Sequence, residues 1–271
     1  MATIHPTAVV HPDAKIAEGV EVGPYSIVGP HVNLKEGVVL RSHVVVEGHT
    51  TIEQGTVVFQ FASIGAKPQD LKYRGEKTFV YIGKNCEIRE CVTINSSCGE
   101  GTTVRVGNNC LLMAYVHVAH NCVLGDNVIL SNSVSLAGHV EVGNYAIVGG
   151  FTPVHQFTRI GAHAMCGGMS RLDGDLGPFL IGGGTEFKVG GINLVGLRRR
   201  EFALERTVKL GKLFKWVYRS ELPMELALNE IVKEFSLDDA DVKLWVDFYS
   251  AQTKRGYAGY RRSAQTEQAL I

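Results

Sequence analysis

The feature that most constrains the fold is a six-residue period. From Ile4 to Leu172 every sixth residue is Ile, Leu or Val, except at Asp70, Glu76, Glu100 and Cys166. The chain is 45% hydrophobic, so chance does not hold one phase over this length. A period of six fits neither an α-helix nor a simple alternating strand. It indicates an internal repeat of the β-helix type, in which each hexapeptide gives a short strand and a turn.

Three hexapeptides are expected to form one triangular coil, with the branched residue of each pointing inward. With coils stacked about 4.8 Å apart, the repeat predicts roughly nine coils and a prism about 45 Å long. Glycine often follows the inward residue, and we expect it to supply the backbone angles of a tight corner. These glycines are Gly23, Gly29, Gly65, Gly83, Gly107, Gly125, Gly143, Gly161 and Gly167.

The period is interrupted near residues 66–80 and 95–105, where polar residues predict two loops outside the prism. Long loops on a rigid scaffold often carry function. In the first loop, Asp70 is suited to accept hydrogen bonds from sugar hydroxyls and Lys72 to bind a phosphate. The alternative interpretation is a solvated connector.

Histidines cluster in the regular repeat between residues 106 and 172: His117, His120, His139, His155 and His163. His120 and His139 are one coil plus one residue apart, so we expect them on adjacent coils near the same face. One interpretation is a zinc site, as in γ-type carbonic anhydrases. A second is a general base with supporting groups. Surface histidines without a role are the third.

The six-residue phase lapses after Leu172, and we predict a β-helix over residues 1–190 followed by a helical domain over 191–271. A first helix, 197–219, has apolar residues near helical spacing at Leu204, Val208, Phe214 and Val217. Pro223 suits the first turn of a second helix. Ser236 to Asp239 resembles a capping box before a third helix. The tail from residue 254 is expected to be poorly ordered.

The first helix is basic, although the chain has no formal net charge. Its charged residues are Arg198, Arg199, Arg200, Arg206, Lys209, Lys212, Lys215 and Arg219, against Glu201 and Glu205. This pattern is typical of a solvated face, or of a dock for an acidic partner or for phosphates. The lack of interleaved aromatic residues argues against nucleic acid.

The cysteines and the apolar segments bear on the compartment. None of the six cysteines forms a Cys-x-x-Cys pair, which favours free thiols in a reducing cytosol. No basic segment with an apolar stretch opens the chain, and no run of 18 apolar residues occurs. We therefore expect a cytoplasmic protein without a membrane span.

Several segments together resemble a known family. They are IHPTA from residue 4, KPQDLKYRGEKT from 67, LMAYVHVAHNC from 112, GGFTPVHQFTRIGAHAM from 149 and GGINLVGLRRR from 190. In this order they are similar to the acyl-ACP–UDP-N-acetylglucosamine O-acyltransferases, which catalyse the first step of lipid A biosynthesis. The resemblance implies a homotrimer of left-handed parallel β-helices with active sites between neighbouring prisms. It also implies a (3-hydroxy)acyl donor on the phosphopantetheine of acyl carrier protein, an acceptor 3-hydroxyl on UDP-N-acetylglucosamine, and no metal or other cofactor.

The resemblance assigns roles residue by residue. His120 matches the general base, and Gly138 matches the backbone N–H that binds the oxyanion. Gly168 matches the position that sets acyl length; glycine leaves the pocket deep, so we expect a chain of about a dozen carbons or more. The positions matching substrate-binding residues are Gln69, Asp70, Lys72, His117, His139, His155, Gln156, Asn193, Arg199 and Arg200.

Three positions depart from the family pattern. Asn121 stands where the family often has Asp, Asn95 where it has a substrate-contacting His, and Val195 where a Glu reads the uracil. These departures bear on base tuning and nucleotide contact.

The alternatives to O-acyl transfer are the N-acyltransferase of the same pathway, whose repeat follows an extra N-terminal domain, a zinc-dependent γ-type carbonic anhydrase, and a non-catalytic solenoid scaffold.

Overall fold

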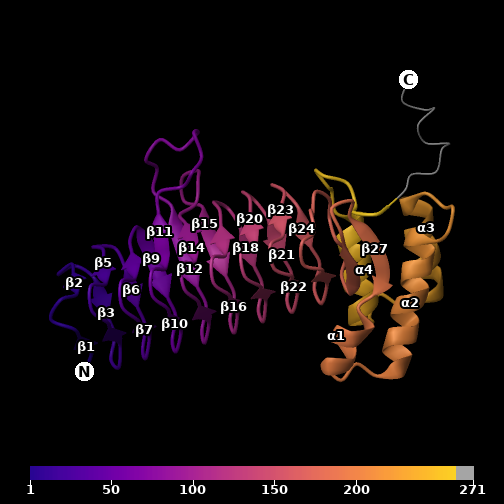
Figure 1. Cartoon of the computed structure of the whole chain (residues 1–271). Helices are drawn as coiled ribbons and strands as arrows, with labels where there is room; N and C mark the ends of the chain where they lie inside the picture. Colours follow the sequence, from indigo (N-terminus) through magenta and orange to yellow (C-terminus); the bar gives the residue numbers. More distant parts are fainter. Residues whose placement is uncertain (261–271) are drawn as a thin grey trace.

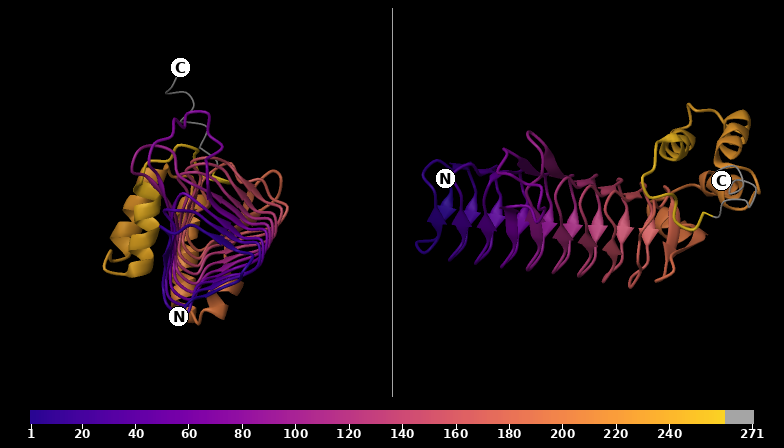
Figure 2. Two further views of the ribbon diagram at one scale, coloured as in Figure 1. Left: turned by 90° about the vertical axis from the view of Figure 1, so that its left-hand side faces the viewer. Right: turned by 90° about the horizontal axis from the view of Figure 1, so that it is seen from above.

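A computed structural model describes residues 1–260 of the 271-residue chain and shows a long prism with helices at one end (Figure 1). Short parallel strands stack into three flat faces, and the outline viewed along the prism is triangular (Figure 2). The protein is a left-handed β-helix built from the predicted hexapeptides, followed by the predicted helices. Its inward residues, such as Val118, Leu136 and Val154, are buried as the period predicts.

Each face takes every third strand. Face A contains β1 (Thr3–Ile4), β4 (Glu21–Val22), β7 (Val39–Leu40), β10 (Val57–Val58), β13 (Glu87–Ile88), β16 (Leu111–Leu112), β19 (Ile129–Leu130), β22 (Ile147–Val148) and β25 (Met165–Cys166). Face B contains β2 (Val9–Val10), β5 (Ile27–Val28), β8 (Val45–Val46), β11 (Ser63–Ala66), β14 (Thr93–Asn95), β17 (His117–Val118), β20 (Ser135–Leu136) and β23 (Pro153–Val154). Face C contains β3 (Lys15–Ile16), β6 (Asn33–Leu34), β9 (His49–Ile52), β12 (Phe79–Ile82), β15 (Thr103–Val106), β18 (Val123–Leu124), β21 (Glu141–Val142) and β24 (Arg159–Ile160).

The turns between faces form three edges, named here after the faces they join. Edge AB includes residues 113–116, 131–134 and 149–152. Edge BC includes residues 119–122, 137–140 and 155–158. Edge CA includes residues 125–128, 143–146 and 161–164. Both predicted loops leave the prism at edge BC, because they follow β11 and β14 of face B.

The expected role of the repeat glycines was largely wrong. Apart from Gly65, the glycines that follow inward residues do not have positive φ. The left-handed corner residue comes later in the turn and is often large, as at Tyr115 (φ 65°) or Phe157 (φ 65°). A Cβ on Gly23 would instead lie 2.7 Å from the backbone of Arg41 in the next coil. Glycine at these positions therefore permits close stacking of the coils.

Beyond the last coil, β26 (Leu180–Gly183) extends face A and pairs antiparallel with β27 (Lys188–Ile192). The predicted domain boundary at residues 190 and 191 falls within β27. Four helices follow: α1 (Leu194–Arg199), α2 (Leu204–Tyr218), α3 (Met224–Glu234) and α4 (Ala240–Ser250). Their buried side chains include Leu213, Phe214 and Trp245.

The helix ends differ from the sequence predictions. The predicted first helix is two helices, because Glu201 takes a positive φ of 59° just after α1. Pro223 lies at the N-cap position of α3, immediately before its first turn. The expected capping box is absent from α4: the side chain of Asp239 caps it by accepting from the N–H groups of Asp241 and Val242.

Part of the tail is ordered, contrary to prediction. Residues 254–260 pack on the end of the prism, where Asp175 and Tyr257 form a parallel bridge and Ala258 donates its N–H to the carbonyl of Asp175. Asp175 is fully buried, and its carboxylate lies 2.7 Å from the guanidinium of Arg159. The rest of the predicted tail, residues 261–271, lies outside the described residues.

Candidate active site

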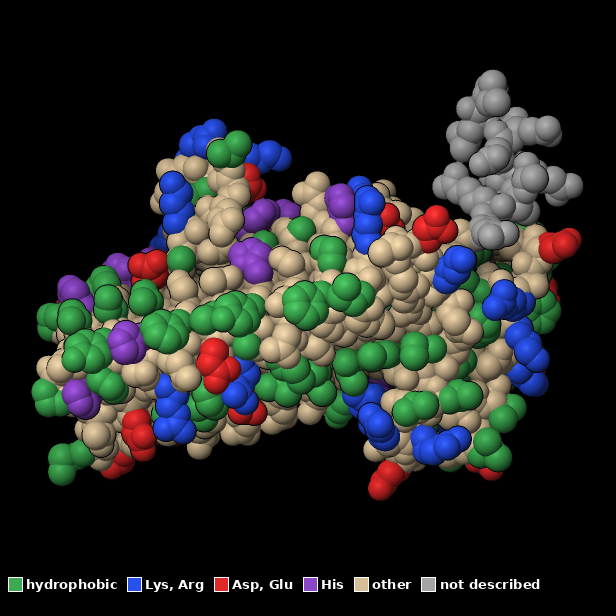
Figure 3. Space-filling view, viewed as in Figure 1, with side chains coloured by type: hydrophobic (Ala, Val, Ile, Leu, Met, Phe, Trp, Pro, Cys, Tyr) green, Lys and Arg blue, Asp and Glu red, His purple; other side chains and the backbone are tan. Residues whose placement is uncertain are grey.

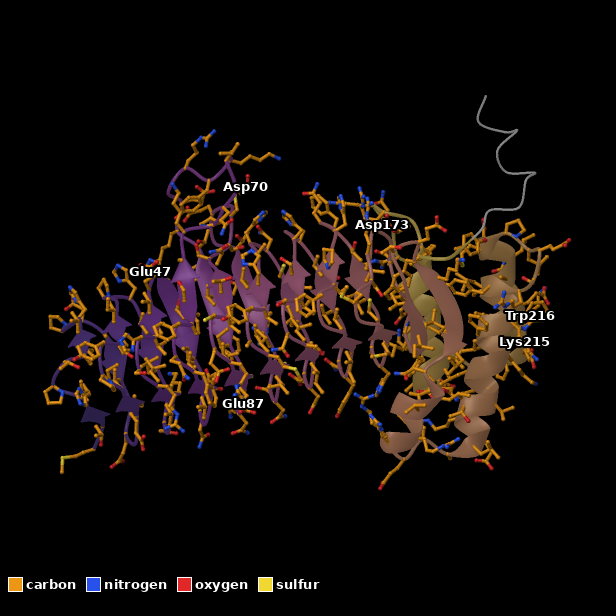
Figure 4. All side chains as sticks on the ribbon, viewed as in Figure 1. Glu47, Asp70, Glu87, Asp173, Lys215 and Trp216 are labelled. Carbon is orange, nitrogen blue, oxygen red and sulfur yellow. The ribbon has the colours of Figure 1, made fainter. Side chains whose placement is uncertain are left out.

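The two loops and the central histidine meet at edge BC. The strands β11, β14 and β17 are neighbours in face B, and each is followed by one of the three segments. Asp70 therefore lies in a loop that stands above the prism (Figure 4). The imidazole Nε2 of His120 is 3.6 Å from a carboxylate oxygen of Asp70, and both side chains are partly exposed to solvent. The loop thus brings a carboxylate to the surface of the repeat histidine.

The coil register stacks further candidates in one column. His117 pairs with Ser135, and Ser135 with Pro153, so positions three residues later also lie above one another. This column contains His120, Gly138 and Gln156. The N–H of His139 donates to the carbonyl of His120 at 3.0 Å, which fixes the spacing between the first two.

Gly138 lies directly against the imidazole of His120. A Cβ at this position would be 2.5 Å from the ring Nε2, so any side chain here would force the ring of His120 to move. Among residues 1–260, no hydrogen-bond acceptor is recorded for the N–H of Gly138, whereas its carbonyl accepts from the N–H of Phe157. The absence of a side chain thus leaves an unused backbone donor beside the histidine.

The departure at Asn121 proves to be a structural clamp. Its side-chain nitrogen donates to the carbonyl of Cys98 at 3.0 Å, and its oxygen accepts from the N–H of Cys98 at 3.2 Å. These two bonds fix the amide orientation, so the oxygen lies 2.8 Å from Nδ1 of His120. Because that oxygen can only accept, Nδ1 carries the proton in the neutral ring. The lone pair is then on Nε2, which faces Asp70.

Asp70 is held as a carboxylate by its own loop. The backbone N–H of Lys72 donates to it at 2.9 Å, and this hydrogen bond is the main cause of its lowered pKa. The charges of His120 and Lys72 act in the same direction, while desolvation opposes them. The carboxylate is therefore ionised at neutral pH and can accept hydrogen bonds beside the imidazole.

Two further histidines surround His120 in neutral form. Burial, and then the proximity of His120, lower the pKa of His117, whose Nδ1 is 2.7 Å from the hydroxyl of Thr93. Burial, followed by His120 and Lys254, lowers the pKa of His139. The ring of His139 meets that of His120 edge-on, with centroids 5.2 Å apart. Both rings can therefore offer neutral hydrogen-bonding groups to a ligand.

The remaining candidates at edge BC are more exposed. Gln69 and Lys72 are exposed in the first loop, and Gln156 is exposed in the coil beyond Gly138. His155 is half-buried, with Nδ1 3.2 Å from the carbonyl oxygen of Gln156. These side chains are placed on the same edge as His120 without a recorded contact to it.

Other candidates lie on different edges. Asn193 caps α1 and donates to the carbonyl of His163 at edge CA, and the Arg200 guanidinium donates to the carbonyl of Tyr145 on that edge. Arg199 is exposed on α1. Gly168 lies at edge AB, where a Cβ would be 3.2 Å from the carbonyl oxygen of Gly150. A single chain does not gather these residues around His120.

The other two departures have different environments. Asn95 is buried, and its side-chain oxygen has no hydrogen-bond partner among the described residues. Val195 is exposed on α1. Neither Asn95 nor Val195 carries an ionisable side chain in place of the His or Glu of the family pattern.

The basic run is partly neutralised within the helical region. Arg206 and Lys209 pair with Asp241, and Lys212 pairs with Glu234. Near Lys212, a hollow of about 560 Å³ is lined by Lys215, Trp216 and Arg219. Lys215 and Trp216 lie on α2 at the far end of the molecule from the two loops (Figure 4). Part of the charge therefore holds helices together, and part remains at the surface.

The sequence did not predict three residues that organise the site. Glu76 and Cys98 link the loops, and Lys254, from the expected tail, lies over the ring of Phe157 beside His139. Glu76 had a visible signal, since it interrupts the six-residue period as Asp70 does.

The described residues contain no group of three His, Cys, Asp or Glu side chains that could hold a metal ion. Within the same range, no helix is long and apolar enough to cross a membrane.

Comparison with known proteins agrees with this architecture. A family model described as UDP N-acetylglucosamine O-acyltransferase, domain 2, matches residues 175–258, and one for bacterial transferase hexapeptide repeats matches residues 103–138. An acyl-[acyl-carrier-protein]–UDP-N-acetylglucosamine O-acyltransferase from Chlamydia abortus is 50% identical over 94% of this chain and 91% of its own. The chain belongs to the UDP-N-acetylglucosamine O-acyltransferase family.

Other members of this O-acyltransferase family give the same result. The relative from Myxococcus xanthus is 44% identical over 94% of this chain and 99% of its own length. The solved UDP-N-acetylglucosamine acyltransferase from Francisella novicida superimposes with a TM-score of 0.91 at 37% identity, covering 98% of this chain and 96% of that one. The plant enzyme from Arabidopsis superimposes with a TM-score of 0.80 at 31% identity, covering 94% and 99%. The predicted fold and family are therefore confirmed.

Proposed function

We propose that this protein transfers a (3-hydroxy)acyl chain from acyl carrier protein to the glucosamine 3-hydroxyl of UDP-N-acetylglucosamine, with His120 as general base. The names of its relatives supply the substrates and the first step of lipid A biosynthesis. The observation that carries the assignment of the base is the orientation of its ring. Nδ1 faces an acceptor on Asn121, which leaves the basic Nε2 toward the open side of edge BC.

The reaction follows from this orientation. Nε2 takes the proton of the 3-hydroxyl as the sugar oxygen attacks the thioester carbonyl carbon. The new C–O bond gives a tetrahedral oxyanion. The carbonyl re-forms as the C–S bond breaks, and the imidazolium returns the proton to the departing thiolate. Asp70, 3.6 Å from Nε2, favours the transient positive charge on the ring.

The free N–H of Gly138 is suited to the oxyanion. It lies beside His120 without a recorded acceptor in the described range, so it can donate to charge that develops on the thioester oxygen. The carboxylate of Asp70 can hold sugar hydroxyls, and the ammonium of Lys72 can meet a phosphate. The neutral rings of His117 and His139 complete a polar surface for the acceptor, and half-buried His155 with exposed Gln69 and Gln156 extends it.

We also propose that the active unit is a homotrimer. The general base, the Asn193–Arg200 segment and Gly168 lie on three different edges of one prism, so only neighbouring copies can bring them together. Edge AB presents large exposed side chains in a column, seen as a row of hydrophobic groups along the prism (Figure 3). This exposed ridge consists of Tyr25, Phe61, Tyr115, Phe151 and Met169. A row of large exposed apolar side chains along one edge is typical of an interface.

The donor and the compartment complete the proposal. The unpaired part of the basic surface, including Lys215, Arg219 and Arg199, suits an acidic carrier protein. The acyl chain arrives on the carrier's phosphopantetheine, and a base with a backbone donor performs the transfer without a metal or other cofactor. The six cysteines are all free thiols, in keeping with a reducing cytoplasm.

Replacing His120 with Ala tests the base. We expect kcat to fall at least about 100-fold, the usual scale for a general base, with the oligomer intact. Turnover is measured by mass spectrometry with UDP-N-acetylglucosamine and a panel of acyl carrier protein thioesters. His11→Ala, in a partly exposed histidine of an early coil, is the matched control and should behave as wild type.

Near-normal turnover of His120→Ala would contradict the assignment. Stoichiometric bound zinc together with loss of activity on chelation would instead favour the carbonic-anhydrase-like alternative. Both measurements use the full chain.

Gly168 is proposed as the acyl-length determinant. Gly168→Met should shift donor preference to shorter acyl chains, because a side chain at edge AB shortens the groove that glycine leaves open. The same donor panel measures the shift. An unchanged preference profile in a correctly assembled variant would reject this role.

A further inference from the structure

Glu76 joins the two loops above edge BC through contacts that the reaction scheme does not use. We propose that Glu76 is a positioning residue for acyl transfer, acting through Cys98 and Asn121 on the ring of His120. This inference rests on the proposed role of His120 as the base. It concerns how the imidazole is held, and not a further group that touches substrate.

The first step is the link between the loops. One carboxylate oxygen of Glu76 accepts from the backbone N–H of Gly99 at 3.0 Å, with the thiol of Cys98 3.7 Å away. Its other oxygen accepts from the backbone N–H of Arg74 at 2.7 Å. Glu76 thus ties the segment that follows Asp70 to the tip of the second loop.

The second step carries this link to the ring. Both backbone groups of Cys98 hold the amide of Asn121, and the amide oxygen receives the Nδ1 proton of His120. Cys98 is adjacent to Gly99, so a displacement of this tip moves both clamp contacts together. If the clamp loosens, the amide can turn and present its NH₂ group to Nδ1, which selects the wrong tautomer for a base at Nε2.

The third step explains why a carboxylate is needed. Two N–H groups from different loops point at two oxygens, and only a carboxylate accepts at both. The hydrogen bond from its own backbone N–H, followed by those from Arg74 and Gly99, lowers the pKa of Glu76 against the opposing effect of desolvation, so it stays ionised at neutral pH. An amide of the same shape would turn a donor toward one of the two N–H groups.

The same unit holds the acceptor side of the site. Asp70 lies in the loop that Glu76 fixes, only a few residues before Arg74, and its carboxylate faces Nε2. The hydrogen bonds of Glu76 therefore help to set the positions of Asn121 and Asp70, which lie on the two sides of the imidazole. Small errors in such geometry are costly, since misplacing reacting groups by about 1 Å can cost about 100-fold in rate.

Glu76→Gln in the full-length protein tests the proposal. We expect kcat to fall about tenfold or more, with a smaller change in KM for UDP-N-acetylglucosamine, because the base is misoriented while most sugar contacts remain. Glu100→Gln is the matched control. The side chain of Glu100 also bridges the loops, by accepting from the N–H of Lys77 at 3.1 Å, but among the described residues it has no recorded hydrogen bond with Cys98 or Gly99. It should retain kcat within about twofold of wild type.

A double-mutant cycle separates positioning from a general structural effect. Asn121→Ala should lower kcat by itself, and adding Glu76→Gln should then lower it little further, because both act on one path to His120. Imidazole nitrogen NMR gives a second readout: the Nδ1-protonated tautomer should dominate in wild type and mix with the other in Glu76→Gln.

The outcomes are distinct. Unchanged kcat in Glu76→Gln, fully additive effects in the cycle, or an unaltered tautomer signal would each overturn the role of Glu76. In those cases the proposed base still stands if His120→Ala is inactive. An active His120→Ala variant would remove the base and this inference together.

Discussion

The contact between Gly138 and His120 shows how a missing side chain can shape a site. The imidazole rests against the backbone of the next coil because residue 138 has no Cβ, and the same gap leaves a free N–H at the ring edge. Residues with positive φ are common at the corners of this prism, but Gly138 is not one of them. Its glycine is explained by space and not by backbone conformation.

Gly138→Ala should therefore lower kcat by at least about 100-fold, because the methyl group displaces the ring and hinders access to the N–H. The Tm of Gly138→Ala should stay close to that of wild type, because the ring of His120 can rotate into solvent. Gly211→Ala on α2 is the control, as nothing lies within 4 Å of a Cβ there. Full activity of the Gly138 variant would mean that the ring does not need its present position.

At the scale of elements, the junction between prism and helices is built around His163. Its ring is stacked between Tyr145 and Phe179, with centroids 4.8 and 5.4 Å away, and Phe202 meets it edge-on. Burial is the main cause of its low pKa of about 4, with the positive charge of Arg200 adding to it. Arg206 acts in the same direction, while Asp241 opposes them.

This environment predicts a pH-dependent stability. The unfolded chain binds a proton at His163 near pH 6.5, and the folded chain only near pH 4. Stability from this residue is therefore full above 6.5 and is lost as the pH falls toward 4. The loss should be on the order of 1 kcal/mol after allowance for solvent screening, which is about 2–4 °C in Tm.

His163→Phe keeps the stacking and removes the proton site. The Tm of the variant minus that of wild type should therefore increase as the pH is lowered from 6.5 to 4. Phenylalanine is compatible with the backbone here, since Phe157 and Phe179 adopt the same positive φ at equivalent corners. Thermal scans across this pH range provide the measurement, with His11→Phe as an exposed control. A constant difference at every pH would contradict the proposed titration.

At the scale of the whole molecule, the exposed ridge along edge AB is the surface that we propose to be covered by neighbouring copies. Its exposed aromatic side chains lie on every second coil, with His43, Cys91 and Ser133 at the same corner of the coils between them, and neighbouring copies in a closed ring would cover them. Interface energy is often concentrated in such large aromatic groups.

Replacing Tyr115 and Phe151 with Arg should convert the proposed trimer to monomers and abolish turnover, because each proposed intersubunit site is then incomplete. Light scattering after size exclusion measures the mass, and the donor assay measures turnover. Leu226→Arg, at an exposed leucine of α3, should change neither. An active monomer would show that one chain suffices.

The sequence predicted the scaffold because a solenoid repeats one local rule. Residues such as Val118 and Leu136 obey it, and each coil contacts mainly its neighbours, so the period alone led to stacked coils. The clamp from Glu76 through Cys98 to Asn121 obeys no period and joins segments from separate coils. The roles assigned to His120 and Gly138 came from resemblance, and the structure adds the ring orientation that no residue pattern contains.

The first loop leaves after Ala66 and returns at Phe79, where β12 resumes its pairing with β9 in unbroken register, from His49 through Ile52. The strand pairing on either side therefore does not depend on the length or sequence of the loop between Ala66 and Phe79. Such a loop can become longer or shorter, or change its residues, while the prism still folds. New acceptor preferences can then arise by exchanging loops, without any change to the part that makes the protein stable.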